Sequence, residues 1–212
     1  MSLVYLVTGP RSASHTPEEK QQIFAGHMAN MQRLAAERKL LIAGPFGQPR
    51  DKSWRGILVL DAATPEEARG LASTDPGVIS EEFSIEVRRI SAPRAIRESP
   101  RLEEAQRARL ARESQEGATP PSAPGSLPPG LRRYVMMHAT DLERAKIAIA
   151  KAKAPRVIWA VSFLDGAGGV LVLDAEDPDA VSTALTGVDA GEFGLDRWLS
   201  TRSLEGLAAP ER

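Results

Sequence analysis

The chain has 212 residues, no cysteine and a formal net charge of −1. The lack of cysteine excludes disulfides, a thiolate nucleophile and cysteine-ligated zinc, and the near-neutral charge gives no electrostatic reason to expect nucleic acid or an anionic membrane as a partner. Apolar residues make up 42% of the sequence, yet no apolar run approaches the roughly 20 residues of a membrane helix. The first residues have no basic region followed by a long apolar stretch, so we expect no signal peptide and a cytoplasmic protein.

The first half of the chain predicts elements in the order strand, helix, strand, strand, helix, strand. Both helices begin with the same four letters, TPEE, in which Thr16 can cap the first helix and Glu19 can close a capping box. The last predicted strand alternates apolar and polar residues, as a strand with one wetter face does. In chain order the segments are LVYLVTG (3–9), TPEE (16–19), LLIAGPF (40–46), RGILVLDA (55–62), TPEE (64–67) and FSIEVRRI (83–90).

A connecting region follows. The sequence SPRLEEAQRARLARESQE (99–116) favours a helix with balanced charges, which predicts a solvated connecting helix or, as an alternative, a helix that binds a partner. Proline and glycine then dominate GATPPSAPGSLPPG (117–130), which is typical of an extended, semi-rigid spacer.

The second half repeats the order of the first half in a less regular form. The clearest echo is GVLVLDA (169–175) against GILVLDA (56–62). A β-α-β-β-α-β order that occurs twice predicts an α+β fold of two ferredoxin-like repeats. We therefore expect a domain over 1–96, a connecting helix and linker over 97–130, and a second domain over 131–205. The second-half segments are YVMMHAT (134–140), DLERAKIAIAKAKA (141–154), RVIWAVSF (156–163), GVLVLDA (169–175) and DPDAVSTALTGVDAGEF (177–193).

The central strands indicate how the two repeats pack. ILVL (57–60), VIWAV (157–161) and VLVL (170–173) do not alternate, whereas a strand with one solvated face should alternate. Both faces of these strands are therefore predicted to be buried, one by helices and the other by the sheet of the second repeat. The result is a barrel-like sandwich within one chain, an intramolecular pseudo-dimer. A second chain could supply the same cover, so a homodimer stays open.

Two stretches carry a family resemblance. GHMANMQRLAAERKLLIAGPF (26–46) has a histidine, the rest of a helix and an Ala-Gly-Pro turn, and in RGILVLDAATPEEARGLASTDPGV (55–78) Asp-Pro follows the second helix. In the spacing of these features residues 3–90 resemble the YciI-like (YCII-related) proteins, which are small ferredoxin-like α+β proteins that usually dimerise through their sheets. Residues 131–204 fit the fold but lack most of the motif, as a degenerate second copy would.

The resemblance implies an active-site His–Asp pair, which by position is His27 and Asp75. The family includes a dehydrochlorinase of chlorinated hydroxyquinol breakdown. Two departures stand out: IFAGH offers no basic residue before His27, and the second half keeps Asp189 without a histidine in its first helix.

The residues themselves leave two interpretations of this pair. An imidazole with a pKa of about 6.5 suits proton transfer near neutral pH, and a carboxylate at one ring nitrogen would orient it. Alternatively, His27 is a core residue with a satisfied hydrogen bond, and Asp75 before a proline shapes a turn.

Further residues have weaker functional interpretations. Gly44 and Pro45 either turn the chain or form a backbone wall beside a ligand, and Arg55, next to Trp54, either lies exposed at a strand end or contacts an anionic, planar ligand. His15 and His138 have no acidic neighbour at metal-ligand spacing, so no metal is predicted. The glycines of DGAGGVLVLD precede a strand and not a helix, which argues against dinucleotide binding, and no cofactor is expected.

Three functions fit these observations. The first is a lyase or isomerase in which His27 acts as general base or acid on a small, aromatic or lactone-like substrate and Asp75 orients it. The second is a non-catalytic module that binds a small ligand or has a structural role. The third is an accessory to a larger enzyme through the helix over 99–116.

Overall fold

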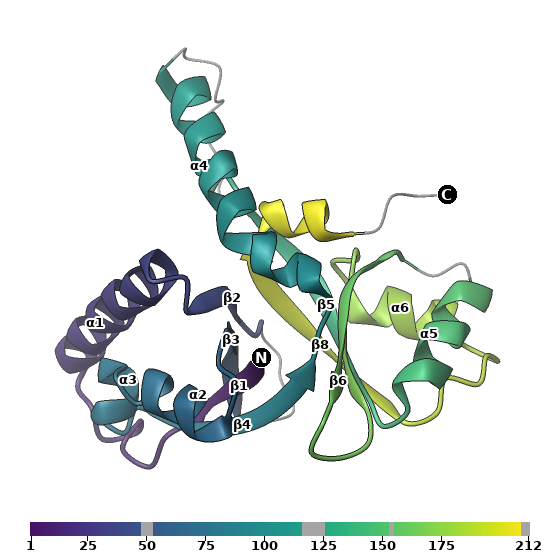
Figure 1. The fold of residues 1–212 in the computed structure, drawn as a ribbon, viewed down its shortest axis with the longest axis horizontal. Helices are drawn as coiled ribbons and strands as arrows, with labels where there is room; N and C mark the ends of the chain where they lie inside the picture. Colours follow the sequence, from purple (N-terminus) through teal and green to yellow (C-terminus); the bar gives the residue numbers. More distant parts are fainter. Residues whose placement is uncertain (48–52, 116–125, 153–154, 209–212) are drawn as a thin grey trace.

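A computed structural model describes residues 1–47, 53–115, 126–152 and 155–208 (Figure 1). It is a mixed α+β structure around one antiparallel sheet with the strand order β2-β3-β1-β4-β6-β7-β5-β8. Most of the proline-rich segment (117–125) lies outside the described residues. The strands are β1 (Ser2–Thr8), β2 (Leu40–Pro45), β3 (Trp54–Leu60), β4 (Phe83–Ser91), β5 (Leu131–Ala139), β6 (Val157–Phe163), β7 (Gly169–Leu173) and β8 (Phe193–Thr201).

The helices begin where the sequence supplies capping residues. Thr16 and Glu19 form the predicted capping box at the start of the first helix, and Thr64 caps the second TPEE helix. The α-helices are α1 (Pro17–Ala36), α2 (Pro65–Ala72), α3 (Pro76–Ile79), α4 (Ser99–Gln115), α5 (Leu142–Lys151) and α6 (Pro178–Ala184), and two 3₁₀ helices are η1 (Arg94–Glu98) and η2 (Arg202–Leu207).

The sheet closes on itself at two seams between the halves of the chain. At one seam β4 pairs with β6, with Ile90 opposite Phe163. At the other, Phe46 forms a bridge with Trp198, whose indole N–H donates to the Gly44 carbonyl at 3.0 Å. The first and last strands of the order thus meet, so no open edge is left along their contact.

Three apolar clusters fill the layers. The largest lies inside the closed sheet and takes buried side chains from both halves, among them Tyr5 and Ile57 from the first and Met136 and Trp198 from the second. The other two lie between each half of the sheet and its own helices.

Every residue of β7 and all of 56–60 in β3 are buried, which confirms two covered faces for these two strands. Each such Val or Leu side chain contributes about 1.5–3 kcal/mol on burial. In β6 the third non-alternating run is buried less completely, because Val157 and Ala160 are half-buried.

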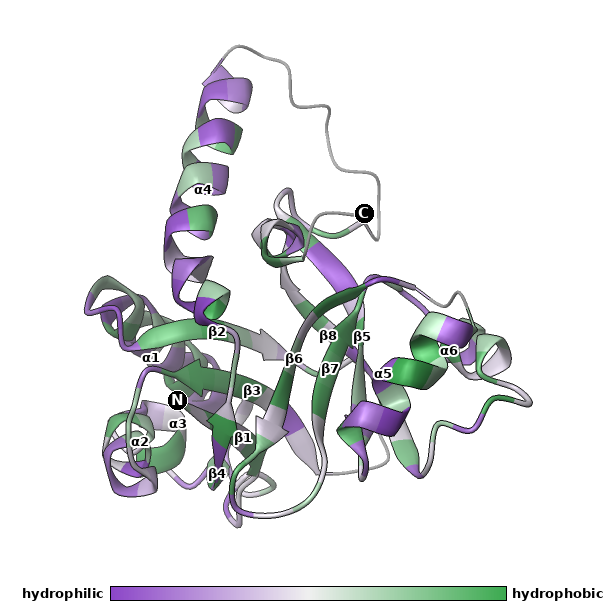
Figure 2. Cartoon of the chain, turned by 45° about the vertical axis from the view of Figure 1, so that its right-hand side comes forward, coloured by the Kyte–Doolittle hydropathy of each residue, from purple (hydrophilic) through white to green (hydrophobic). Residues whose placement is uncertain are grey.

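Helix α4 projects away from this body (Figure 1), and purple, hydrophilic positions predominate along it (Figure 2). Two ion pairs follow its length, Arg107–Glu103 and Arg109–Glu113, at the i,i+4 spacing of a solvated helix face. The connecting segment is thus a solvated helix, as its balanced charges predict.

Candidate functional site

Two elements that cover the same face of the sheet bring His27 and Asp75 together. His27 lies in the middle of α1, and Asp75 is the N-cap of the short helix α3. The His27 Nδ1 atom is 2.7 Å from Asp75 Oδ2. The Asp75 side chain is fully buried and the His27 side chain is 13% exposed, so the imidazole joins a buried carboxylate to the surface.

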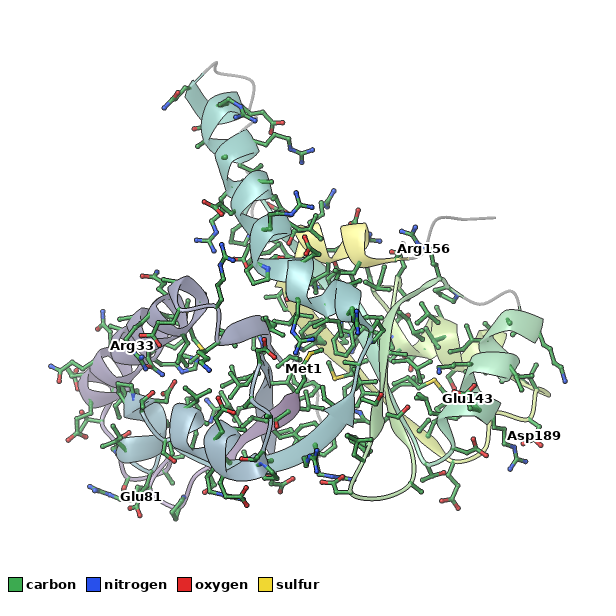
Figure 3. All side chains as sticks on the ribbon, in the orientation of Figure 1. Met1, Arg33, Glu81, Glu143, Arg156 and Asp189 are labelled. Atoms are coloured by element: carbon green, nitrogen blue, oxygen red, sulfur yellow. The ribbon has the colours of Figure 1, made fainter. Side chains whose placement is uncertain are left out.

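The Asp75 carboxylate is fixed from several sides. Its Oδ1 atom accepts a hydrogen bond from the buried Gly77 N–H at 2.7 Å, and this bond caps the start of α3. Its Oδ2 atom also accepts from Asn30 Nδ2 at 3.4 Å. Asn30 is in turn held by Arg33, labelled on α1 in Figure 3, whose guanidinium donates to the Asn30 amide oxygen at 2.8 Å. Asp75 therefore shapes the turn and orients the histidine at once, so the two interpretations of this residue are compatible.

The hydrogen bond sets the tautomer of His27. A carboxylate only accepts hydrogen bonds, so in the neutral ring Nδ1 carries the proton and Nε2 keeps its lone pair. No residue in the described parts of the chain makes a hydrogen bond to Nε2. The ring lies edge-on to Phe83 at 5.5 Å and near Phe24 at 6.2 Å. Phe24 is 60% exposed, so an apolar side chain lies at the surface near the His27 ring.

Arg55 reaches the same face of the sheet through an irregularity of β3. The β1–β3 register shifts between Leu6, which pairs with Gly56, and Val7, which pairs with Trp54. A bulge of this kind re-aims side chains. Trp54 accordingly stacks on Tyr5, at 4.5 Å, within the cluster inside the sheet. The Arg55 guanidinium carbon lies 5.5 Å from the centre of the Phe83 ring, on the side of the helices.

Sequence reasoning missed a second polar cluster beside Arg55. The Glu82 carboxylate accepts from Ser12 Oγ at 2.8 Å and lies 2.9 Å from His15 Nδ1, while Arg55 is 3.5 Å away. Burial raises the pKa of Glu82, but the hydrogen bonds from His15 and Ser12 outweigh it and hold the pKa below its usual range. His15 and Glu82 are 67 residues apart in the chain, and no local pattern signals their contact.

Gly44 and Pro45 lie elsewhere. Gly44 packs at the seam with β8, where an added Cβ would overlap the Leu199 carbonyl and lie 2.8 Å from the Trp198 indole nitrogen. Pro45 is exposed at the end of β2. The structure thus brings Arg55 to Phe83, whose ring also lies 5.5 Å from that of His27, and it gives Gly44 a packing role at the seam.

The second half carries no matching pair in its described residues. Asp189 forms an ion pair with Arg144 and lies at the outer edge of the molecule, 71% exposed (Figure 3). His138 is near Asp196, at 3.4 Å, and its ring lies 4.6 Å from Trp54, inside the closed sheet and away from the helices. This arrangement predicts one acid–base site per chain.

Two hollows of about 450 and 460 Å³ lie along α4 and η2, and neither is lined by His27, Asp75 or Arg55. Within residues 1–47, 53–115, 126–152 and 155–208 there is no group of three or more metal-ligating side chains. Among the same residues no helix combines the length and apolar character needed to span a bilayer.

Comparison with known proteins gives one family match. The sequence model of the YCII-related domain matches residues 2–91. A search of curated proteins found no match. The fold is similar to a siroheme decarboxylase, NirDL, with 11% identity and a TM-score of 0.43 over 95% of this chain and 71% of that one. It is also similar to an anthrone oxidase-like protein, with 12% identity and a TM-score of 0.38 over 95% of this chain and 91% of the other. Neither likeness bears on the chemistry of the chain.

Proposed function

Residues 2–91 are a YCII-related domain, and on that premise we propose that the chain is a small-molecule lyase or isomerase in which His27 transfers a proton and Asp75 orients it. The observation that carries the proposal is the 2.7 Å contact between a fully buried carboxylate and a histidine that reaches the surface. A general base must be held by a partner and still reach its substrate. The contact with Asp75 supports the first condition, and the exposed part of the His27 side chain supports the second.

The proposed reaction begins with Nε2 of neutral His27, which takes a proton from an acidic C–H or O–H of the substrate. Asp75 stabilises the imidazolium that forms. The electron pair left on the substrate either expels a leaving group from the neighbouring atom, which is an elimination, or is protonated by His27 at another position, which is an isomerisation. A positioned acid–base group of this kind supplies roughly 10²–10⁴-fold in rate.

A tandem repeat within the chain is part of the same proposal. We infer that residues 1–96 and 131–205 are two copies of one ferredoxin-like unit joined by 97–130. The strand orders β2-β3-β1-β4 and β6-β7-β5-β8 support this, because in each half the strands lie side by side in the order second, third, first and fourth. The second copy has lost the histidine and supplies the cover for the first sheet, as the partner subunit would in a dimer.

Proton transfer can be tested without a known substrate. The purified protein is incubated in D₂O with a panel of carbon acids, including halogenated phenols, lactones and 2-hydroxy acids, and deuterium incorporation and halide release are followed by NMR and ion analysis. We expect exchange or elimination with the wild type and Asp189→Asn, and a loss of at least 100-fold with His27→Gln. Equal turnover by wild type and His27→Gln would refute the proposal.

A non-catalytic module is the second candidate, and it is favoured because no His–Asp pair lies between the helices of the second half at the positions that correspond to His27 and Asp75, within the described residues. In that case His27→Gln lowers the melting temperature and leaves the binding of small ligands intact. An accessory role through α4 is the third candidate, favoured by the projection of this helix from the body (Figure 1). A chain that lacks 99–116 would then fail to capture a partner that the full chain captures.

A further inference from the structure

Arg55 is a held guanidinium with unused hydrogen-bond donors. Its partners in the described structure are the face of Phe83 and one Glu82 oxygen at 3.5 Å, a distance beyond that of a good hydrogen bond. The side chain is 33% exposed. The five N–H donors of this rigid fork make no good hydrogen bond to any residue in the described parts of the chain. A guanidinium of this kind can bind a carboxylate through two parallel hydrogen bonds.

Glu82 does not fill this role because its oxygens are already engaged. Oε2 pairs with His15 at 2.9 Å, and Oε1 accepts from Ser12 at 2.8 Å. The carboxylate is buried, so His15 and Ser12 hold it in place. Its Oε1 lies 3.5 Å from Arg55 and positions the guanidinium from one side through charge, while a third of the Arg55 side chain stays exposed.

The position of Arg55 relative to His27 sets the size of a ligand that could touch both. The Arg55 guanidinium carbon and the His27 ring centre each lie 5.5 Å from the centre of the Phe83 ring. They are therefore at most about 11 Å apart, twice that distance. A carboxylate in the fork and a hydrogen-bond approach to Nε2 take up roughly 3 Å at each end, so at most about 5 Å is left between them, which excludes any group wider than one six-membered ring.

We propose that Arg55 binds the carboxylate of the substrate, and that the substrate is a small monocarboxylate with a single ring, held flat beside Phe83 with an acidic hydrogen at His27. The inference rests on the proposed acid–base function of His27 and adds the chemical class of the substrate. Phe83 and the exposed Phe24 give the ring of the substrate apolar surroundings on the two sides of His27.

Binding is tested with benzoate as the probe and benzamide as its neutral analogue. The chain has three histidines, so the ring signals in a ¹H–¹³C spectrum can be assigned from single substitutions. We expect benzoate to shift the His27 signals in the wild type and in Arg69→Gln, a control at an exposed arginine of α2. Benzamide at equal concentration leaves them unchanged.

The decisive variants are Arg55→Gln and Arg55→Lys. Loss of a charge-assisted bidentate contact predicts an affinity for benzoate at least about tenfold weaker in Arg55→Gln. Arg55→Lys keeps the charge without the fork and should fall in between, which guards against a misfolded glutamine variant. Equal affinity in the wild type and both variants, or no binding of benzoate, would overturn the inference.

Failure of the acid–base proposal gives a different result. In that case His27→Gln retains benzoate binding, followed through the Arg55 Nε–H signal, while deuterium exchange is absent from the wild type as well. Conversely, the wild type could exchange deuterium into uncharged carbon acids at a rate that Arg55→Gln does not change. That result would support the acid–base function and refute the binding of a substrate carboxylate by Arg55.

Discussion

The strongest test of the His27–Asp75 site is the replacement of Asp75 by alanine and by asparagine. In Asp75→Ala the buried Gly77 N–H and the Nδ1–H of His27 both lose their acceptor. Each buried group left without a partner costs about 1–3 kcal/mol, so the free energy of unfolding should fall by about 2–6 kcal/mol. This is a large part of the roughly 5–15 kcal/mol that stabilises a typical domain.

In Asp75→Asn the amide oxygen can still accept from Gly77, so we expect a smaller loss of about 1–2 kcal/mol. The amide N–H₂ then points to His27 and selects the other tautomer, with the proton on Nε2. Asparagine should therefore abolish proton abstraction while it spares most of the stability. Urea unfolding followed by circular dichroism measures the first effect, and deuterium exchange measures the second. The matched control is Asp189→Ala in the exposed turn, expected within about 0.5 kcal/mol of wild type. An Asp75→Ala protein as stable as wild type would refute the reasoning.

Three further predictions concern the seam, the two tyrosines and Glu82. Gly44→Ala should cost about 1–3 kcal/mol or more in urea unfolding, because the added Cβ meets the Leu199 carbonyl; unchanged stability would show that the seam is open. Burial raises the pKa values of Tyr5 and Tyr134, the only tyrosines of the chain, so absorbance at 295 nm should show no phenolate near pH 10 until the protein unfolds, whereas a normal titration would contradict their burial. The hydrogen bonds that lower the pKa of Glu82 contribute stability above the ordinary glutamate value, which is lost as pH falls through the lowered one; Glu82→Gln should flatten this loss of melting temperature between about pH 5 and pH 3, and an equal acid slope would exclude Glu82 as its source.

The parts of the fold that local patterns determine could be predicted from the sequence. Caps such as Thr16 and the unbroken apolar runs of β3 and β7 place helices and doubly buried strands. The sequence predicts that a second sheet covers the inner face of the first one, but it does not predict which strands of the two halves pair. Which strands meet depends on how the sheet closes, since Phe46 forms a bridge with Trp198, which is far from it in the sequence.

The sequence likewise predicts some residues of the candidate site and not others. His27 and Asp75 could be predicted because the family motif fixes both positions, and the structure adds the contact between them. Asp75 and Pro76 follow the second helix as predicted, and the structure adds a short helix α3 that Asp75 caps, because Pro76 suits a first helical position. The placement of Arg55 depends on a one-residue register shift between β1 and β3, and the pairing of β1 with β3 leaves no mark in the local sequence.

Closure of the sheet explains why the second half can do without a counterpart of the His27–Asp75 contact. The first half needs β6 and β8 as neighbours, and it needs the apolar side chains that the second half adds to the shared interior. These demands concern burial alone, so hydrophobic residues of suitable size on β5 to β8 satisfy them whatever the second half's helices carry. Helix α5 has 10 residues against the 20 of α1, and Asp189 is exposed to solvent beside Arg144. Substitutions on the outer face of the second half should therefore leave the His27 site intact, whereas those that empty the shared interior should reach it through the sheet.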